Sequence, residues 1–196
     1  MARDHLFTLG APVDTNTRGR LAVPVDTHDH VRGPIRAPVT LVEFGHYQCA
    51  ECADLEPHLR DLLRLRAPGL RLVFRHFPLP VTHLQPYKLM ASEIAEAAAM
   101  RHRFWPMHDW LFAHQHEIDR AGLRRAVLLL DLPPEAVDVE VSQQVYRARI
   151  VRDYEGGLRS GVLHTPTLFV NGGRVDSGTS LPDLLPALDR ALGASD

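Results

Sequence analysis

Apolar residues change their spacing along the chain, and the first part of this pattern predicts a strand, a helix and a second strand. Residues 39–44 form a compact run of strand-forming residues, as expected of a buried strand. From Ala50 to Pro68 the apolar residues recur at spacings of three and four, which predicts an amphipathic helix. Residues 70–77 are a second apolar run. Strand, helix and strand in fewer than 40 residues predict a βαβ unit with parallel strands.

The middle of the chain has a helical pattern. Residues 83–158 contain strong helix formers, and prolines suited to a first turn stand at Pro86, near Pro106 and at Pro133. We expect four or five helices in this segment.

Strand character returns near the end of the chain. Residues 167–170 are apolar, residues 171–173 read Asn-Gly-Gly, which favours a hairpin turn into residues 174–175, and a last helix is expected over residues 182–192. The order β-α-β, helices, β-β-α predicts an α/β fold that carries a helical insertion.

This order divides the chain into four parts. Residues 1–37, rich in Pro, Gly, Asp, Thr and Arg, are expected to form an N-terminal arm. Residues 38–82 hold the βαβ unit, residues 83–158 the helical insertion, and residues 159–196 the final hairpin and helix.

Charge and hydropathy argue against a nucleic-acid-binding protein and against a membrane-embedded one. The formal charge is −2, with 22 Lys plus Arg against 24 Asp plus Glu, so the chain has no basic footprint for nucleic acid. It also has no apolar run near the roughly 18 to 20 residues that span a bilayer, so we expect a protein that is not membrane-embedded. The first residues lack the apolar segment of a secretory signal, which predicts a cytoplasmic protein unless a leader has been removed.

The only two cysteines, Cys49 and Cys52, stand three residues apart where the first strand gives way to a helix. At a helix N-terminus the partial positive charge favours the thiolate over the thiol. We therefore expect Cys49 to be a nucleophile. Cys52, one turn further along the helix, is placed to attack a mixed disulfide formed at Cys49.

The alternative use of the two thiols is a zinc site completed by two of the 12 histidines. Zinc ligands recur at short paired spacings such as His-x3-5-His. His28 and His30 are too close together for that spacing, and His102 and His108 are six apart. We favour redox chemistry and assign no metal ligand.

Four segments together resemble the DsbA-like branch of the thioredoxin superfamily, above all domains that occur alone or attached to sodium/proton antiporters. They span residues 39–52, 74–79, 104–109 and 160–172, in the order found in the family. The resemblance implies a thioredoxin fold with an inserted all-helical domain. It also implies a thiol-disulfide oxidoreductase that exchanges disulfides with protein or peptide substrates and with an unidentified redox partner. Such proteins need no cofactor beyond the Cys49/Cys52 pair.

Three residues match family positions. Glu43 corresponds to a buried acidic residue beneath the active site, where burial raises the pKa and a carboxyl group can take the proton of Cys52 through water. Pro166 corresponds to a cis-proline that faces the disulfide, and Thr165 before it would pair its backbone with an extended substrate. The alternatives are an exposed strand position for Glu43 and an ordinary trans-proline.

The chain departs from the family between the cysteines, where it has Ala50-Glu51. A carboxylate beside Cys49 disfavours the thiolate and predicts a weaker oxidant, with a reduction potential roughly between −180 and −270 mV. His46 and His164 are also unusual. We place His164 at the substrate-binding rim and expect both histidines to be solvated loop residues, with thiolate stabilisation as the alternative. A thioredoxin-like module that binds a peptide without turnover is the alternative function.

Overall fold

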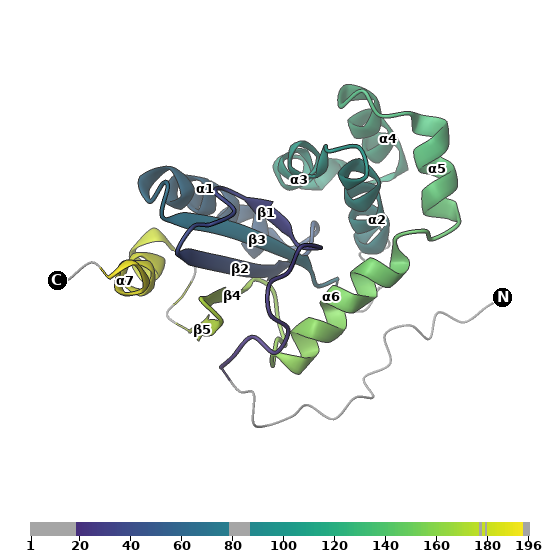
Figure 1. The fold of residues 1–196 in the computed structure, drawn as a ribbon. Helices are drawn as coiled ribbons and strands as arrows, with labels where there is room; N and C mark the ends of the chain where they lie inside the picture. The colour runs from purple at the N-terminus through teal and green to yellow at the C-terminus, as the bar shows by residue number, and fades with distance from the viewer. Residues whose placement is uncertain (1–18, 79–86, 177, 179, 194–196) are drawn as a thin grey trace.

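The computed structural model describes residues 19–78, 87–176, 178 and 180–193 (Figure 1). A five-stranded sheet has the order β1-β3-β2-β4-β5. Its strands are β1 (His30–Arg32), β2 (Val39–Gly45), β3 (Leu70–His76), β4 (Thr167–Val170) and β5 (Gly173–Val175). The helices are α1 (Ala50–Leu65), α2 (Lys88–Ala99), α3 (Phe104–Ala113), α4 (Arg120–Leu129), α5 (Pro134–Ser142), α6 (Arg147–Arg159) and α7 (Leu181–Leu192), with a 3-10 turn η2 (Gln115–Glu117).

The predicted βαβ unit is confirmed. β2 and β3 are parallel neighbours at the centre of the sheet, with Val39 opposite Leu70. Nearly every residue of both strands is buried, because helices cover both faces, and this is why the two segments read as continuous apolar runs. The Asn171–Gly172 turn has positive φ at both residues, 46° and 81°, as the predicted hairpin requires.

The predicted N-terminal arm, residues 1–37, contains a strand that the sequence analysis did not predict, β1. Residues 30–32 pair antiparallel with β3 and form the edge of the sheet. α3 covers this edge, since the Trp105 Nε1–H group donates to the Val31 carbonyl at 2.9 Å. A strand of three residues with two charged or polar side chains shows no alternation, so the sequence pattern could not reveal it.

One face of the sheet packs against α1 and α7. Apolar side chains from β2, β3, β4 and the two helices form one cluster there, including Leu41, Leu59, Leu72 and Leu188. Figure 1 shows α1 and α7 beside the sheet, away from the other helices. α1 thus lies along the sheet with its first residue at the end of β2, which fixes the place of the cysteines.

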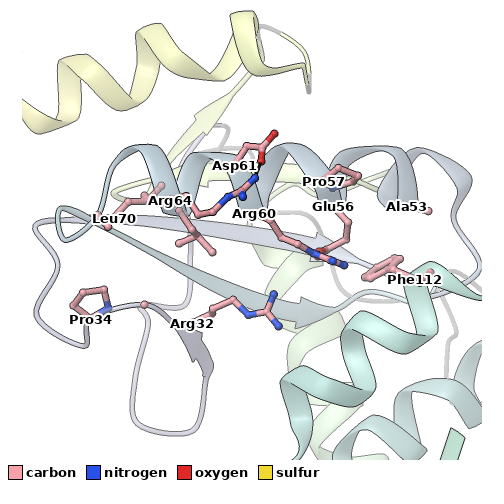
Figure 2. Close-up of a pocket in the computed structure, with 14 residues that line it drawn as sticks. Arg32, Pro34, Ala53, Glu56, Pro57, Arg60, Asp61, Arg64, Leu70 and Phe112 are labelled. Atoms are coloured by element: carbon pink, nitrogen blue, oxygen red, sulfur yellow. Dashed lines mark hydrogen bonds and ion pairs between the residues drawn. The ribbon is translucent and has the colours of Figure 1, made fainter.

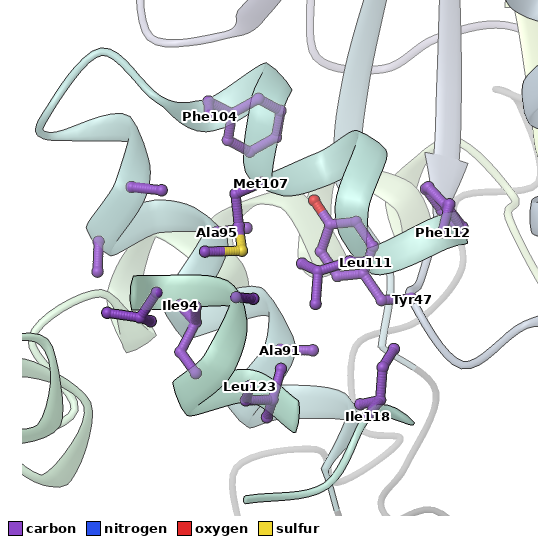
Figure 3. Packing of buried hydrophobic residues seen from close by; sticks show 14 of the residues in the cluster. Tyr47, Ala91, Ile94, Ala95, Phe104, Met107, Leu111, Phe112, Ile118 and Leu123 are labelled. Atoms are coloured by element: carbon purple, nitrogen blue, oxygen red, sulfur yellow. The ribbon is translucent and has the colours of Figure 1, made fainter. Parts of the chain in front are cut away.

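The helices α2 to α5 gather beside one end of the sheet (Figure 1). Their core contains Ile94, Met107, Leu111 and Leu123, and Tyr47 enters it from the loop after β2 (Figure 3). Between residues 88 and 159 the structure has five α-helices, as the periodicity predicts. The helix start predicted at Pro86 lies outside the described residues.

α6 returns from the helical part to the second face of the sheet. Tyr154 stacks on Phe77 with ring centroids 4.7 Å apart. A Cβ atom at Gly157 would lie 2.6 Å from the Phe77 ring, so only glycine lets the helix come this close. Within the described ranges, every helix is too short or too polar to span a bilayer.

Candidate active site

Cys49 is the N-cap residue of α1. Its backbone is extended (φ −97°, ψ 116°), and its Sγ accepts a hydrogen bond from the Cys52 backbone N–H at 3.3 Å. Helix N-caps leave backbone N–H groups without intrahelical partners, and a thiolate can satisfy them. Cys49 retains 9% of its surface exposed, whereas Cys52 has none. Both are free thiols.

The pKa of Cys49 is lowered from 9.0 to about 6. Hydrogen bonding from the Cys52 thiol is the largest cause; burial opposes it, while Thr165 and the Cys52 backbone N–H add to the lowering. The charge of Glu51 raises the pKa, in the direction that the sequence predicts, but it is the smallest of these contributions. Cys49 is therefore mostly ionised at neutral pH.

This ionisation predicts how Cys49 reacts with pH. The rate of alkylation by iodoacetamide should rise with a midpoint near pH 6, because only the thiolate attacks. Glu51→Gln should move the midpoint to lower pH, since it removes a repelling charge. Glu155→Gln, at an exposed glutamate on α6, is the control and should leave the midpoint unchanged. A midpoint near 8.5, the ordinary value for cysteine, would contradict this assignment.

Cys52 has the opposite environment. Burial is the main cause that raises its pKa, and the hydrogen bond to Cys49 and the charge of Glu43 raise it further. At neutral pH its thiol keeps its proton. The pair therefore consists of one ionised sulfur at the surface and one protonated sulfur behind it.

Glu43 lies on β2 with no exposed surface, and within the described residues neither carboxyl oxygen has a hydrogen-bond partner. Its pKa is raised well above the ordinary value by burial first, then by the charges of Glu56 and Cys49. The exposed position considered as an alternative is wrong. A Cβ atom built on Gly45 would lie 2.7 Å from Glu43 Oε1 and 3.4 Å from Cys52 Sγ, so the carboxyl group and the sulfur border the same small space.

The loop before β4 faces Cys49. The Thr165–Pro166 peptide bond is cis, as expected, and Cys49 Sγ lies 3.5 Å from the Thr165 carbonyl oxygen, to which it donates a hydrogen bond only while it is protonated. His164 is exposed, and its Nε2 lies 3.4 Å from Nη2 of Arg174. The expected solvated position of His164 is confirmed.

The prediction that His46 is solvated is wrong, because only 3% of its surface is exposed. Its Nδ1 accepts a hydrogen bond from the Gln48 backbone N–H at 3.2 Å, so the ring is buried while it orders the active-site loop. Gln115 also holds this loop: its Nε2 donates to the carbonyls of Tyr47 (3.0 Å) and Cys49 (2.7 Å). No sequence signal pointed to Gln115, which comes from the helical part.

A series of buried hydrogen bonds links Tyr47 of the cysteine loop to His108 and Glu56. Tyr47 Oη is 3.3 Å from His108 Nδ1, and His108 Nε2 is 2.6 Å from Glu56 Oε1. Burial is the main cause that lowers the pKa of His108, against the opposing charge of Glu56. These hydrogen bonds join the cysteine loop, α3 and α1. Of the aromatic residues of α3, Phe104 and Phe112 are buried in the core of the helical part, and Trp105 and Trp110 are partly buried against it.

A cavity of about 850 Å³ runs along α1 beside β1, with Arg32 and Arg60 facing one another across it (Figure 2). Its arginines are already opposed by carboxylates: Arg60 by Glu56 at 3.3 Å and Arg32 by Asp109 at 2.8 Å. Of the described residues that line it, none is a cysteine, so the cavity is separate from the thiols.

Among the described residues, two groups of three potential ligands converge, His30 with His76 and Glu96, and Glu56 with His108 and Asp109. Neither group includes Cys49 or Cys52.

Comparison with known proteins shows the family of the chain. A family model described as thioredoxin matches residues 26–190. The chain belongs to the thioredoxin family. Its fold is the predicted DsbA-like thioredoxin fold, as solved structures show. BdbD from Bacillus subtilis aligns with a TM-score of 0.76 at 18% identity, over 90% of this chain and 99% of that one. Wolbachia pipientis α-DsbA1 aligns with a TM-score of 0.70 at 19% identity, over 88% and 94%.

Curated relatives agree with the resemblance to antiporter-attached domains. The chain is 45% identical over 155 residues to Na(+)/H(+) antiporter NhaA 3 of Salinispora tropica, covering 79% of this chain and 23% of that protein. It is 41% identical over 176 residues to NhaA 1 of Salinispora arenicola, covering 89% and 26%. The chain thus spans about a quarter of the length of these relatives.

Proposed function

We propose that the protein is a thiol-disulfide oxidoreductase that exchanges disulfides with protein or peptide substrates through Cys49 and Cys52. One observation carries the proposal: Cys49 Sγ caps α1, where its pKa is lowered, with the buried Cys52 one turn behind it and the Thr165 carbonyl oxygen 3.5 Å away. Attack on a disulfide sulfur needs a thiolate and no bound cofactor, and this arrangement supplies the thiolate and a second thiol to resolve the mixed disulfide.

The reaction has two steps. The Cys49 thiolate attacks one sulfur of a substrate disulfide, which breaks the S–S bond, releases one substrate thiolate and leaves a mixed disulfide at Cys49. Cys52 then loses its proton and attacks the Cys49 sulfur. This forms the Cys49–Cys52 disulfide and releases the second substrate sulfur as a thiolate. Two electrons pass from the protein to the substrate, and a separate redox partner of the thiol class restores the dithiol. The reverse sequence oxidises a substrate dithiol.

Glu43 is the base for the second step. Cys52 cannot attack while it holds its proton, and its burial makes the proton hard to lose to solvent. The Glu43 carboxyl group borders the same space as the Cys52 sulfur, and one water molecule there would pass the proton between them. Thr165 and Pro166 hold the substrate backbone beside Cys49, and His164 lies at the entrance to this surface.

Gly45 makes this transfer testable. Gly45→Ala places a methyl group between the Glu43 carboxyl and Cys52 Sγ, where it would lie 2.7 Å and 3.4 Å from them. We expect the second step to slow by about 10- to 100-fold, measured as the decay of the mixed disulfide after rapid mixing. In a Glu43→Gln background the same change should add no further loss, because the transfer it blocks is already absent. Gly156→Ala in α6, where the methyl group meets Val23 at an ordinary 3.4 Å, is the control. Equal slowing in both backgrounds would contradict the role of the space.

Redox strength follows from the same residues. The pKa of Cys49, about 6, supports an oxidant weaker than one with a thiolate pKa near 3.5. We propose a reduction potential roughly between −180 and −270 mV, to be measured by equilibration with glutathione. A value near −120 mV would contradict this part of the proposal.

The compartment is also part of the proposal. In the cytoplasm, the compartment expected from the sequence, the pair would rest as a dithiol and serve reduction, isomerisation or repair. A similar structure is described as a periplasmic thioredoxin-like protein from Salmonella enterica, and in an oxidising compartment the pair would rest as a disulfide. Acid-trapping the thiols in cells and counting the alkylated cysteines by mass distinguishes the two.

An insulin-reduction assay tests the activity. The proposed enzyme accelerates insulin precipitation in a way that depends on Cys49, whereas a module that only binds peptides does not. Native mass spectrometry of the reduced protein and of Cys49→Ser separates both from a protein with zinc at the thiols, because such a protein would lose the mass of that ion when Cys49 is replaced. Activity that survives loss of Cys49 would exclude the proposal.

A further inference from the structure

Three ionisable side chains outside the proposed reaction meet where the sheet contacts the helical part. His30 comes from β1, His76 from the end of β3 and Glu96 from α2. The Nε2 atoms of His30 and His76 lie 2.7 and 2.8 Å from the same oxygen, Glu96 Oε1. His30 pairs with Phe74 across the two strands, and His76 is two residues further on the same face, so the sheet register brings the two rings together.

The group is buried but has a path to solvent. The side chain of His76 has no exposed surface, Glu96 has 6% and His30, at the sheet edge, has 14%. Burial acts to raise the pKa of Glu96, but hydrogen bonds from His30 and His76 outweigh it and hold the carboxyl group ionised. Arg149, which lies near enough to interact with that charge, is ion-paired with Asp153. A buried carboxylate therefore faces two imidazoles, with a neighbouring cation already neutralised.

We propose that His30, His76 and Glu96 bind a divalent transition-metal ion of the zinc class. Two imidazole nitrogens and one carboxylate oxygen are donors that suit such an ion, which accepts them at about 2.0–2.2 Å. The three donor atoms lie within 4.8 Å of one another. Ligands around a tetrahedral ion stand roughly 3–3.5 Å apart, so the nitrogen–oxygen distances must lengthen by about half an ångström.

The proton balance allows this exchange. In the metal-free form each Nε2 carries a proton that is donated to Glu96; on binding, the ion takes the place of these protons and each neutral ring keeps one proton on Nδ1. For His76 this tautomer change breaks no existing bond, because among the described residues its buried Nδ1 has no partner. Phe104 stacks on His30 and fixes the plane of that ring. A fourth ligand, a water molecule, would enter beside His30, the one of the three side chains at the edge of the sheet.

The second convergent group lacks these properties. In the group of Glu56, His108 and Asp109, both nitrogens of His108 are already paired, and the ring has no exposed surface. Arg60 and Arg32 are ion-paired with its two carboxylates and would repel a cation. The contrast makes the His30 group the one suited to a metal, and an ion there would join β1, β3 and α2.

Titration of the full chain with Zn²⁺ and Co²⁺ tests the site. The protein is used with the Cys49–Cys52 disulfide formed, so that the thiols cannot bind the ion. We expect one ion per chain by isothermal titration calorimetry, visible Co²⁺ absorption without a thiolate band, and a melting temperature that rises with the metal concentration.

His30→Gln is the main variant, because its position at the edge of the sheet tolerates a neutral amide that still donates to Glu96. We expect its affinity for Zn²⁺ to fall at least about tenfold, with unchanged circular dichroism. His28→Gln, at a histidine whose side chain is 69% exposed, is the matched control and should bind as the unchanged protein does. No binding by the oxidised protein up to about 1 mM Zn²⁺, or binding that His30→Gln leaves unaltered, would overturn the proposal and leave a hydrogen-bonded triad only.

Discussion

Replacing Cys49 with serine should abolish insulin reduction, lowering the rate to that of the buffer alone. With a pKa of about 6, roughly nine-tenths of Cys49 is thiolate at pH 7, whereas a cysteine of ordinary pKa is only a few per cent ionised. Serine has no comparable ionised form near neutral pH. The buried Cys52 cannot replace it, since its pKa is raised and none of its surface is exposed.

Mass spectrometry after brief iodoacetamide treatment at pH 7 measures the same asymmetry directly. The unchanged protein should gain one label, located on Cys49, and Cys49→Ser should gain none in that time. Cys52→Ser is the matched control, because it removes the other sulfur of the pair and keeps the reactive one. Labelling of Cys52 at a rate within a few-fold of Cys49 would contradict the division of roles.

Glu43→Gln should slow the second step of exchange by about 100-fold while the first attack keeps its rate. Glutamine has nearly the shape of glutamate but cannot accept the Cys52 proton. Stopped-flow measurement separates the two steps, since formation of the mixed disulfide depends on Cys49 alone and its decay depends on Cys52. Glu51→Gln, which removes an exposed carboxylate beside the same cysteines, should leave the decay unchanged. A Glu43→Gln protein whose decay equals that of the unchanged protein would remove Glu43 from the mechanism.

The same substitution should alter how stability depends on pH. The folded pKa of Glu43 is raised, so the folded protein binds this proton more tightly than the unfolded chain does. The stability from this group is complete below the ordinary pKa of about 4.3 and is lost as pH rises toward the folded pKa. Glutamine stays neutral. In denaturant unfolding, the free energy of unfolding of the variant minus that of the unchanged protein should therefore rise by about 1.4 kcal/mol for each pH unit in this window. Parallel pH profiles would show that Glu43 titrates as it does in the unfolded chain.

The parts of the fold that the sequence predicted are those in which neighbouring residues share one environment. β2 and β3 are buried on both faces, so each reads as an unbroken apolar run, and α1 buries one stripe, so it shows the spacing of a helix. The hairpin before β5 was visible because its turn needs residues that tolerate positive φ.

Features set by distant partners could not be predicted in this way. β1 exists because β3 and Trp105 satisfy its backbone, and neither lies near it in the sequence. Gln115 reaches the cysteine loop from 66 residues away. Local composition does not indicate which distant residues make such contacts.

The candidate site was predicted in part from residues and in part from resemblance. The reactivity of Cys49 followed from its place at a strand-to-helix junction. In contrast, its approach to Thr165, 116 residues further along the chain, followed only from the family pattern. The structure brings Cys49, Cys52, Glu43 and Thr165 together, and it sets His164 at the solvent side. The size of the effect of Glu51 could not be judged beforehand, because it is outweighed by hydrogen bonds that depend on the folded geometry.

The most direct test is the mass of the Cys52→Ser protein after reaction with an excess of a disulfide-bonded peptide. An ionised Cys49 that attacks, without Cys52 to release the product, should hold one peptide chain through a disulfide bond at Cys49, and dithiothreitol should remove it. An unmodified mass would contradict disulfide exchange at this pair. So would a peptide that becomes attached to the Cys49→Ser protein under the same conditions.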